Sequence, residues 1–307
     1  MEEKIWADIL ENTQARKVIA ILPSRELCVV CRSRNIWIAD VQHGVIAHKH
    51  PWYGAALRSK DPIKFLPNSF LLWDQGSADV ITTWADPLNV DVKIIGNRWL
   101  ARFILQNKDD KLVATTNSEF KKYLNKEKDP RPIILVTLSW SQEGVANGII
   151  ADSIINIIQK THSKYRWLLR LHSNQITGFA SNEFKQFLAI YKNELDTFCE
   201  WEIPTKTALP AVLLNTDLHI TWHSSVVMEA AQYGIRSATL DPRLLAEFSN
   251  DYFEYHKKLG YIDFIVNEEL IIEKWIEENI AVKMGMQNFD IENKNYEALL
   301  KFLVSVS

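Results

Sequence analysis

The chain has 307 residues, 47% of them hydrophobic and 24% charged, a composition typical of a globular protein with a sizeable core. Its net charge of -3 and the lack of a Lys/Arg cluster exclude the usual nucleic-acid-binding surface. No apolar signal segment opens the sequence, and the longest apolar runs are too short to span a bilayer. We therefore expect a cytoplasmic protein.

The first third of the chain predicts short strands alternating with helices. The expected helices are residues 5–15 and 25–34, and the expected strands are residues 18–22, 36–41, 70–73 and 91–96. The later strands are apolar runs closed by turn signals, as in a buried parallel sheet. Residues 109–128 are polar and charged and precede Pro130 and Pro132, so we interpret them as a connection between two domains.

A second alternating series follows this connection. Its expected strands are residues 133–138, 167–171, 198–203, 218–222 and 237–240, and its expected helices are residues 146–161, 181–195, 209–215, 225–233 and the tail 268–304. Alternation at this spacing predicts βαβ units in an α/β fold with parallel sheets. We place the two domains at residues 1–128 and 129–307.

The pair Cys28 and Cys31 has the spacing of a metal or redox site. No second pair accompanies it, and the surrounding residues are those of a buried helix or strand. We therefore expect a structural role. With three cysteines and no secretory signal, a reducing compartment fits best.

The turn Gln42-His43-Gly44 follows an expected strand and precedes His48, His50 and Tyr53. A histidine in such a turn can accept a proton from a hydroxyl near neutral pH, and glycine would let the backbone turn sharply beside a ligand. A lone histidine is more often structural. A metal site is the third alternative, but no acidic or cysteine ligands cluster with these histidines.

A second site candidate is His223-Ser224-Ser225, which lies between an expected strand and helix and is followed by Glu229. Hydroxyls and backbone amides at such a position suit a phosphate or diphosphate. Glu229 lies one helical turn beyond Ser225, where its carboxylate can accept hydrogen bonds from ribose hydroxyls. The alternative is an ordinary serine cap with an exposed glutamate.

Two weaker candidates lie at the ends of other expected strands. One is the loop that contains Ser139, Ser141 and Gly144, a composition found in phosphate-binding loops but not specific to them. The other is the pair Arg170 and His172, which could contact phosphate or base. Ligands of parallel sheets bind at the carboxyl ends of the strands, so all four candidates have a suitable position.

Several nucleotide-binding classes are excluded by motif. The chain lacks the GxxxxGK[ST] loop of P-loop proteins and the GxGxxG turn of nicotinamide dehydrogenases. It also lacks the GxSxG elbow of α/β-hydrolases.

In their order along the chain, the four candidates resemble the GT-B glycosyltransferases of bacterial capsule, lipopolysaccharide and teichoic-acid synthesis. The turn at 42–44 with His50 and Tyr53 resembles a QHG signature, residues 70–73 and 92–97 resemble the strands after it, and 223–234 resembles an SSxxxEA donor-binding element. The resemblance covers about residues 30–245.

The resemblance implies a GT-B fold of two Rossmann-like domains facing a cleft, and a metal-independent sugar transfer without a cofactor. His43 would be the catalytic base or a group that positions the acceptor. The acceptor would lie near Gln42, Gly44, His50 and Tyr53. The donor would be bound by Ser139, Ser141, Gly144, Arg170, His172, His223, Ser224, Ser225 and Glu229.

Two departures from the family pattern leave alternatives open. Ser173 stands where a proline usually follows the histidine, and only about forty residues precede the QHG strand, so the first domain is unusually short. A nucleotide-sugar epimerase or a glycerophosphotransferase of the same fold is an alternative enzyme. A truncated, non-catalytic paralogue that binds ligand or supports a synthase complex is the alternative from another class.

The expected partners follow from the same resemblance. They are a nucleotide-sugar donor and a glycan or lipid-linked acceptor on the cell surface, with no nucleic acid. A short first domain would also leave room for a partner chain or a homo-oligomer. A lipid-linked acceptor would bring the protein to the inner membrane face, although no basic amphipathic helix indicates it.

Overall fold

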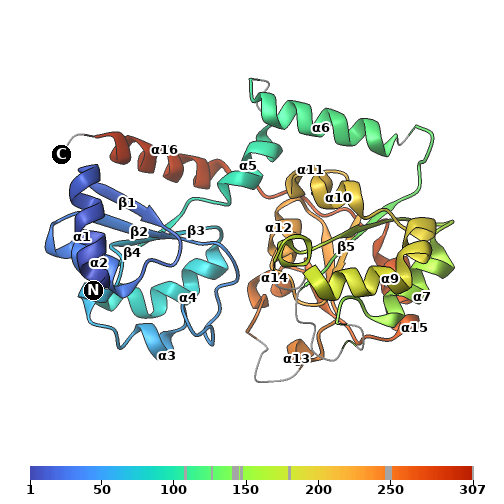
Figure 1. Ribbon diagram of the computed structural model, residues 1–307, viewed down its shortest axis with the longest axis horizontal. Coiled ribbons are helices and arrows are strands. Elements are labelled where there is room, and N and C mark those ends of the chain that lie inside the picture. The colour runs from blue at the N-terminus through green and yellow to red at the C-terminus, as the bar shows by residue number, and fades with distance from the viewer. Residues whose placement is uncertain are drawn as a thin grey trace. The chain divides into compact units, whose positions relative to one another are not determined.

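The computed structural model describes residues 1–106, 109–125, 127–139, 145, 148–178, 181–245 and 251–305 (Figure 1). Every pair of hydrogen-bonded strands in this part of the chain is parallel, and the strands form two separate sheets. The predicted α/β class with two parallel sheets is therefore confirmed.

The chain divides into two compact units. Unit 1 comprises residues 1–98, 251–254 and 288–307, and unit 2 comprises residues 99–250 and 255–287. In unit 1 the elements are α1 (Glu2–Thr13), β1 (Lys17–Ala20), α2 (Arg25–Ser33), β2 (Trp37–Val41), α3 (Ala55–Arg58), η1 (Ile63–Phe65), β3 (Ser69–Leu72), α4 (Gln75–Ala85), η2 (Asp86–Leu88), β4 (Asp91–Ile94) and α16 (Asp290–Val304).

The sheet of unit 1 has the strand order β1-β2-β3-β4 and is covered on both faces. Successive side chains of a strand point to opposite faces. In β3, Phe70 and Leu72 accordingly pack with residues of α4, whereas Leu71 packs with Leu299 of α16. Burial on both sides explains why this strand reads as a continuous apolar run in the sequence.

Unit 2 contains the longer part of the chain. Its elements are α5 (Arg98–Leu105), α6 (Lys111–Leu124), β5 (Ile133–Thr137), α7 (Asp152–Thr161), β6 (Arg166–Arg170), α8 (Ser173–Ile176), α9 (Ser181–Phe198), α10 (Glu202–Lys206), α11 (Leu209–Leu213), β7 (Leu218–Thr221), α12 (Val226–Gln232), β8 (Arg236–Thr239), α13 (Pro242–Leu245), α14 (Glu254–Lys258), β9 (Ile262–Phe264) and α15 (Glu269–Asn279).

The sheet of unit 2 has the order β6-β5-β7-β8-β9. Successive side chains of the central strand β5 again point into two different core clusters. Ile134 and Val136 pack in a cluster with α7 and α15, and Ile133 and Leu135 pack in a second cluster that includes Leu100 of α5. The carboxyl ends of β5, β7 and β8 thus lie at one edge of a sheet whose two faces are filled.

The expected connection at 109–128 is wrong in its structure, because most of it is helix α6. Asp110 caps this helix, its Oδ1 accepting from the backbone N of Val113 at 3.3 Å. Phe120 and Leu124 are buried in the second core cluster of unit 2. Apolar residues recur at helical spacing in α6, but lysines and threonines lie between them. The two compact units divide between Arg98 and Trp99, at the start of α5, whereas the sequence placed the division after residue 128.

Three other expected elements differ from the structure. The strand expected at 198–203 is only a single bridge between Glu200 and Leu168, because α9 continues to Phe198 and α10 begins at Glu202. The helix expected from 146 begins at Asp152 instead. The helical tail is interrupted between α15 and α16, which belong to different units.

Helix α16 returns the chain to unit 1. Asn295 donates its Nδ2 hydrogen to the backbone O of Ile94 at 2.7 Å, and the Arg98 guanidinium lies 4.1 Å from the centroid of the Tyr296 ring. Gly96 lies two residues beyond β4, and its left-handed φ together with the contact that a Cβ there would make with Glu292 shows why glycine suits this position.

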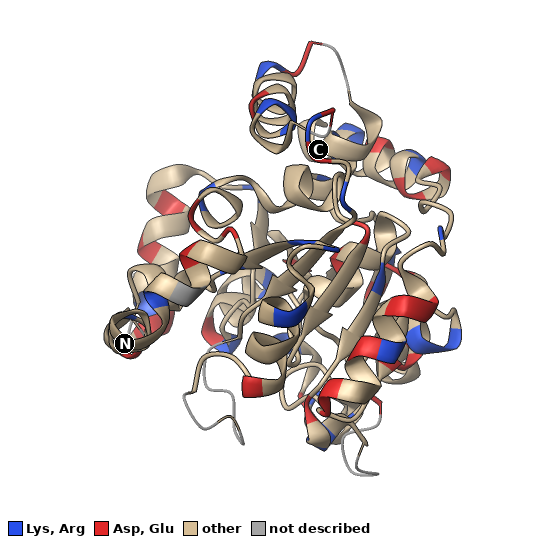
Figure 2. Ribbon diagram, turned by 90° about the vertical axis from the view of Figure 1, so that its right-hand side faces the viewer, with Lys and Arg blue, Asp and Glu red and all other residues tan. Residues whose placement is uncertain are grey.

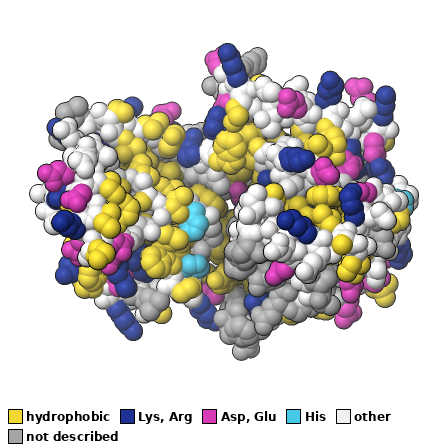
Figure 3. Space-filling model, viewed as in Figure 1, with side chains coloured by type: hydrophobic (Ala, Val, Ile, Leu, Met, Phe, Trp, Pro, Cys, Tyr) yellow, Lys and Arg dark blue, Asp and Glu magenta, His cyan; other side chains and the backbone are white. Residues whose placement is uncertain are grey.

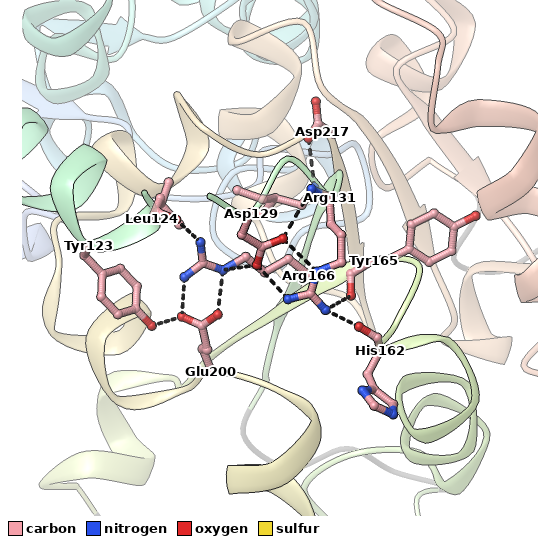
Figure 4. A network of polar contacts seen from close by, with 10 residues as sticks. Tyr123, Leu124, Asp129, Arg131, His162, Tyr165, Arg166, Glu200 and Asp217 are labelled. Atoms are coloured by element: carbon pink, nitrogen blue, oxygen red, sulfur yellow. Dashed lines mark hydrogen bonds and ion pairs between the residues drawn. The ribbon is translucent and has the colours of Figure 1, made fainter. Parts of the chain in front are cut away.

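A buried polar network fixes the amino ends of β5 and β6 in unit 2 (Figure 4). Arg166 binds both carboxylate oxygens of Glu200, at 2.5 and 2.8 Å, and also donates to the backbone O of Leu124. Tyr123 donates its hydroxyl hydrogen to the same glutamate. Because Tyr123 and Leu124 end α6, the network ties that helix to the sheet.

The charged side chains of unit 2 are of mixed sign. Basic and acidic residues are interspersed along the helices, as Figure 2 shows. An example is the row of ion pairs between α7 and α15, in which Lys160 pairs with Glu273. None of the described helices combines the length and apolar character needed to cross a bilayer.

Candidate functional site

In unit 1, Gln42 organises the turn that follows β2. Its Oε1 accepts from the backbone N of Trp73 at 2.7 Å, and its Nε2 donates to Ser77 Oγ and to the backbone O of Gly44, both at 2.9 Å. The side chain is 3% exposed. Both amide hydrogens are therefore used within unit 1, which makes Gln42 a residue that positions the turn; its predicted acceptor contact remains a prediction.

His43 is exposed beside this turn, while its predicted partner Tyr53 is buried. The Tyr53 hydroxyl oxygen lies 3.4 Å from His43 Nδ1. Partial burial lowers the pKa of His43, so the neutral imidazole predominates at pH 7. Histidine side chains are visible on the surface of unit 1 in Figure 3. The structure therefore offers a neutral imidazole at a strand end.

His50 is held in one tautomer by the backbone. Its Nδ1 accepts from the backbone N of Trp52 at 3.1 Å and of Tyr53 at 3.3 Å, which leaves the hydrogen on Nε2. Gly54 makes this tight loop possible, because a Cβ there would lie 2.1 Å from the backbone O of His48. His50 thus presents a donor, in contrast to the base expected of His43.

The glycine at 44 is not explained by its backbone. Its φ lies outside the left-handed region, and a Cβ there would meet nothing within 4 Å. The expectation that the turn itself requires glycine is therefore wrong. A close approach to a ligand remains a prediction.

In unit 2, His223 belongs to a charged cluster at the carboxyl ends of β7 and β8. Its Nδ1 lies 3.1 Å from Oδ2 of Asp241, and Arg243 binds the same carboxylate at 2.6 Å. Burial alone would raise the pKa of Asp241, but the hydrogen bonds from His223 and Arg243 outweigh it and hold that pKa well below its usual range. A carboxylate that accepts from Nδ1 leaves the His223 Nε2 lone pair available.

Ser224 and Ser225 precede α12, as predicted, and both are half-buried. Ser224 Oγ accepts from the backbone N of Val226 at 3.3 Å. Ser225 makes no side-chain cap hydrogen bond. Its hydroxyl is therefore not committed to capping the helix.

Glu229 lies one turn into α12, where its carboxylate interacts electrostatically with Arg170 of β6. Burial raises the pKa of Glu229 to about 7, and the Arg170 charge offsets only part of that effect. Arg170 donates to the backbone O of Pro204 and, at 2.7 Å, to that of Thr207. The arginine thus holds a loop, and its positive charge acts on the Glu229 carboxylate.

His172 begins α8 and forms a reciprocal cap with Gln175. His172 Nδ1 accepts from the backbone N of Asn174 at 3.2 Å, and the backbone N of His172 donates to Gln175 Oε1 at 2.8 Å. The ring hydrogen is then on Nε2, so His172 offers a donor, as His50 does.

Ser139 is buried directly after β5, in the position predicted for a donor-binding loop. Ser141 and Gly144 lie outside the described residues. Within the described ranges, no group of three or more His, Cys, Asp or Glu side chains could hold a metal ion. Cys28 and Cys31 are buried free thiols on α2, and burial raises their pKa to about 12 and about 11, as expected of structural cysteines.

One histidine that the sequence did not single out lies inside the sheet of unit 2. His219 of β7 is fully buried between Thr137 Oγ1, at 2.7 Å from its Nε2, and Ser237 Oγ, at 2.9 Å from its Nδ1. Burial lowers its pKa to about 3. This neutral imidazole joins β5, β7 and β8 below their carboxyl ends and stabilises the strands that carry the cluster.

Comparisons with known proteins identify the fold. No protein-family model matches the sequence, and neither does any curated protein at a significant level. The fold is similar to UDP-GlcNAc 2-epimerase from Neisseria meningitidis bound to UDP-GlcNAc, with TM-score 0.64 and 15% identity over 98% of this chain and 80% of that chain. The enzyme from Methanocaldococcus jannaschii gives TM-score 0.62 and 13% identity over 98% and 80%.

A third similar structure is the wall teichoic acid polymerase TagF, with TM-score 0.55 and 14% identity over 88% of this chain and 69% of that chain. At such identities the likeness shows the fold alone. Together with the two parallel sheets, it identifies a GT-B-like fold of Rossmann-type units.

The sequence prediction did not include the residues that contact its candidate His223. Asp241 and Arg243 follow β8. Of the two, Asp241 had a usable signal, since an acidic residue directly after an expected strand lies at the sheet edge where ligands bind.

Proposed function

We propose that this protein is a nucleotide-sugar enzyme whose donor binds at the carboxyl ends of β7 and β8 in unit 2. The observation that carries the proposal is the His223–Asp241–Arg243 cluster beside Ser224 and Ser225. A histidine whose Nδ1 contacts a carboxylate, next to two serines of which Ser225 does not cap the helix, is suited to phosphate and hydroxyl groups. The similarly folded Neisseria enzyme was solved with UDP-GlcNAc bound.

In this proposal each donor-side residue has a distinct role. Ser224 and Ser225 bind the diphosphate, and Glu229 accepts hydrogen bonds from the ribose. Arg170 holds two backbone carbonyls with one terminal nitrogen, acts electrostatically on Glu229, and binds the donor phosphate with its remaining nitrogens in the proposal. His172 can donate from Nε2 to the donor. Ser139, Ser141 and Gly144 complete the donor loop in the proposal.

The reaction that we propose is sugar transfer to a hydroxyl of a surface-glycan or lipid-linked acceptor. His43 is its base in this proposal. The imidazole is accessible to a substrate, and its partial burial lowers its pKa, so that the neutral form predominates at pH 7. Helix dipoles and side chains, without a metal or cofactor, would offset the leaving-group charge. The proposed site of action is the cytoplasm, at the inner membrane face where the acceptor is lipid-linked.

A second candidate is a nucleotide-sugar 2-epimerase, which the fold likeness to two such enzymes favours. Inverting a carbon next to the anomeric centre requires removal of a carbon-bound proton and its return from the opposite face. An epimerase would therefore incorporate solvent deuterium at C2, and a transferase would not. We prefer the transferase because a neutral imidazole such as that of His43 is suited to accept a hydroxyl hydrogen.

The first experiment is a thermal-shift screen with UDP-, CDP-, GDP- and CMP-linked donors. A ligand that binds only the folded state raises the unfolding midpoint, and Ser225→Ala and Glu229→Gln should reduce the shift. Asp196→Asn, an exposed carboxylate on α9, is the matched control. If no donor shifts the midpoint of the unmodified chain, nucleotide-sugar binding is contradicted.

The second experiment identifies the reaction with the donor found in the screen. The donor is incubated in D2O with and without a glycan acceptor, and the products are analysed by mass spectrometry. Acceptor-dependent mass gain supports the transferase, deuterium at C2 without acceptor supports the epimerase, and CMP release from CDP-glycerol supports a glycerophosphotransferase. Binding without any product supports a non-catalytic paralogue.

A further inference from the structure

Strand β4 forms one edge of the unit 1 sheet, and it exposes backbone groups on its outer side. Asp91 and Ile95 donate their backbone hydrogens to oxygens at the two ends of β3, at 3.0 and 2.8 Å. Successive residues of a strand direct their backbone groups to alternating sides. The N–H and C=O groups of Val92 and Ile94 therefore point away from the sheet.

Two of the outward-facing groups are already used inside unit 1. The backbone N of Val90 donates to the backbone O of Ala85 at 3.2 Å, and the backbone O of Ile94 accepts from Asn295 Nδ2 at 2.7 Å. In the part of the chain that the structure describes, the other outward groups have no partner. They are the N–H and C=O of Val92, the N–H of Ile94 and the C=O of Val90.

The used and unused groups are complementary to those of a second copy of the strand. In an antiparallel pair, opposed residues alternate between pairs that exchange two hydrogen bonds and pairs that exchange none. With Val92 opposite Val92 of the second copy, the two valines exchange both bonds. Ile94 then lies opposite Val90 of the second copy, and its free N–H meets the free C=O. The bond missing from that pair would join the two groups that Ala85 and Asn295 already satisfy.

The charges of β4 are complementary in the same register. Asp91 and Lys93 have side chains that are 65% and 44% exposed, and Asp91 Oδ2 lies 3.8 Å from Lys93 Nζ. With the pair centred on Val92, Asp91 of each copy lies opposite Lys93 of the other. Opposite charges at opposed positions stabilise a pair of strands, and like charges destabilise it. A lysine alone on an edge strand discourages pairing, but the aspartate two residues earlier makes this strand its own complement.

The α4 side of β4 has room for the side chains of a second strand. A groove of about 850 Å³ lies along α4 and β4, and its lining includes Ala78, Thr82, Val92 and Ile94. The two β4 side chains are only half-buried. A two-fold axis perpendicular to the sheet keeps the faces of both copies on the same side. Val92 and Ile94 of the second copy would therefore cover this groove and remove more apolar surface from water.

The opposite edge of the same sheet lacks this complementarity. Strand β1 carries one charged residue, Lys17, and no acidic residue. Its ammonium group donates to the backbone O of Ser305 at 2.7 Å, at the end of α16. A second copy paired along β1 would gain no opposed charges. The comparison favours β4 as the edge that pairs.

We propose that β4 pairs with β4 of a second copy of this chain, antiparallel and centred on Val92, so that two four-stranded sheets become one sheet of eight strands. The interface is isologous, because the same groups serve on both sides of the two-fold axis. The proposal concerns the edge of the unit 1 sheet and is independent of the reaction proposed above.

The test is the oligomeric state of the full chain, measured by sedimentation velocity from about 1 to 100 µM. We expect a dimer. Asp91→Lys places two lysines opposite each other, and Lys93→Asp places two aspartates opposite each other, so each variant should raise the Kd of dimerisation at least about tenfold. When the two variants are mixed, every opposed pair again has opposite charges. A heterodimer should therefore form.

Two further variants make the test specific. Glu277→Lys reverses an exposed charge on α15 and should leave the Kd unchanged. Val92→Pro removes a central N–H that faces away from β3, so the sheet keeps its own hydrogen bonds while the dimer is lost. Circular dichroism checks that each variant is folded. Hydrogen exchange at the Val92 and Ile94 amides should be slow in the dimer and fast in Asp91→Lys.

Three results would overturn the proposal. The first is a monomeric unmodified chain over the whole concentration range, which would assign the edge of β4 to another partner or to none. The second is a dimer that both single charge reversals leave intact. The third is a mixture of folded Asp91→Lys and Lys93→Asp that stays monomeric. If Val92→Pro does not fold, this mixture decides alone.

Discussion

Asp40 and Asp241 are the same residue type in the same kind of place, yet their surroundings give them opposite properties. Both lie at or just beyond the carboxyl end of a strand, one in each unit, and they are 0% and 2% exposed. Asp241 accepts from His223 and Arg243, which hold its pKa well below its usual range. Asp40 has one backbone partner and an unused oxygen, and burial raises its pKa to about 7.

The difference shows that hydrogen-bond partners, more than burial, decide the ionisation of a carboxylate at a strand end. Asp241 is a permanent anion that can orient an imidazole at any physiological pH. Asp40 lies near the midpoint of its titration and can respond to its neighbours. The two aspartates thus differ in ionisation because their hydrogen-bond partners differ.

The largest expected effect is a loss of stability on substitution of Arg166. Its partner Glu200 is fully hydrogen-bonded but lies far from the strand ends that carry the candidate site. Arg166→Ala removes a buried guanidinium, leaves the half-buried Glu200 and the Leu124 carbonyl without it, and should lower the free energy of unfolding by about 3 kcal/mol. Urea unfolding followed by tryptophan fluorescence measures it. Lys164→Ala, which removes an exposed pair with Glu277, should cost less than about 1 kcal/mol. Equal losses would mean that the network is not stabilising.

A pH series on Asp40→Asn should give the next largest effect. An acid whose folded pKa is raised destabilises the folded state as pH rises from its unfolded pKa towards its folded pKa. From about pH 4 to pH 7 the variant should therefore gain stability relative to the unmodified chain, by up to about 4 kcal/mol. Urea midpoints at each pH measure the difference. A constant difference across the series would show that Asp40 does not titrate in this window.

Asp241→Asn should show the opposite dependence. A depressed folded pKa contributes stability that is present above the unfolded pKa of about 4 and is lost as pH falls towards the folded value. The variant should be less stable than the unmodified chain at pH 7, and the gap should narrow below pH 4. Activity should fall about a hundredfold, because His223 loses its orienting anion. If Asp241→Asn kept full activity at pH 7, orientation of His223 by Asp241 would not contribute to the reaction.

The smallest effect is expected at Glu229. Glu229→Gln keeps the shape but weakens hydrogen bonds from ribose hydroxyls, so nucleotide affinity should fall about tenfold at pH 8. Because burial raises the pKa of Glu229 to about 7, the affinity of the unmodified chain should rise between pH 6 and 8, and that of the variant should stay flat. Calorimetric titration with the nucleotide measures both. Parallel pH profiles would assign the pH dependence to another group.

The sequence predicted β3, β5 and β7 well because burial on both faces makes them short apolar runs, but it missed β9. The unused oxygen of Asp40 illustrates what it could not predict. Its relation to Arg58 and Tyr53 depends on how an irregular loop folds back over β2, and no local pattern encodes that path. The same limit applies to Gln42, whose side chain hydrogen-bonds to Trp73 and Ser77, more than thirty residues later.

Helix α6 shows a second limit. Its buried positions, such as Phe120 and Leu124, are separated by lysines and threonines, so the stretch reads as a polar connection. Packing against unit 2, not an evident apolar stripe, makes it a helix. The motif-based roles of Ser224, Ser225 and Glu229 stay predictions, although the structure does place them together at the start of α12.

The return of α16 to unit 1 has a consequence for synthesis on the ribosome. Unit 2 has all its elements once the segment up to residue 287 has emerged, whereas the sheet of unit 1 still lacks the helix that covers Ala39 and Leu71. Domains fold as units during translation, commonly from the N-terminus onward. Here we expect the reverse order, because one apolar face of the unit 1 sheet stays uncovered until α16 has been made. A chaperone that recognises nascent chains would bind at this uncovered face.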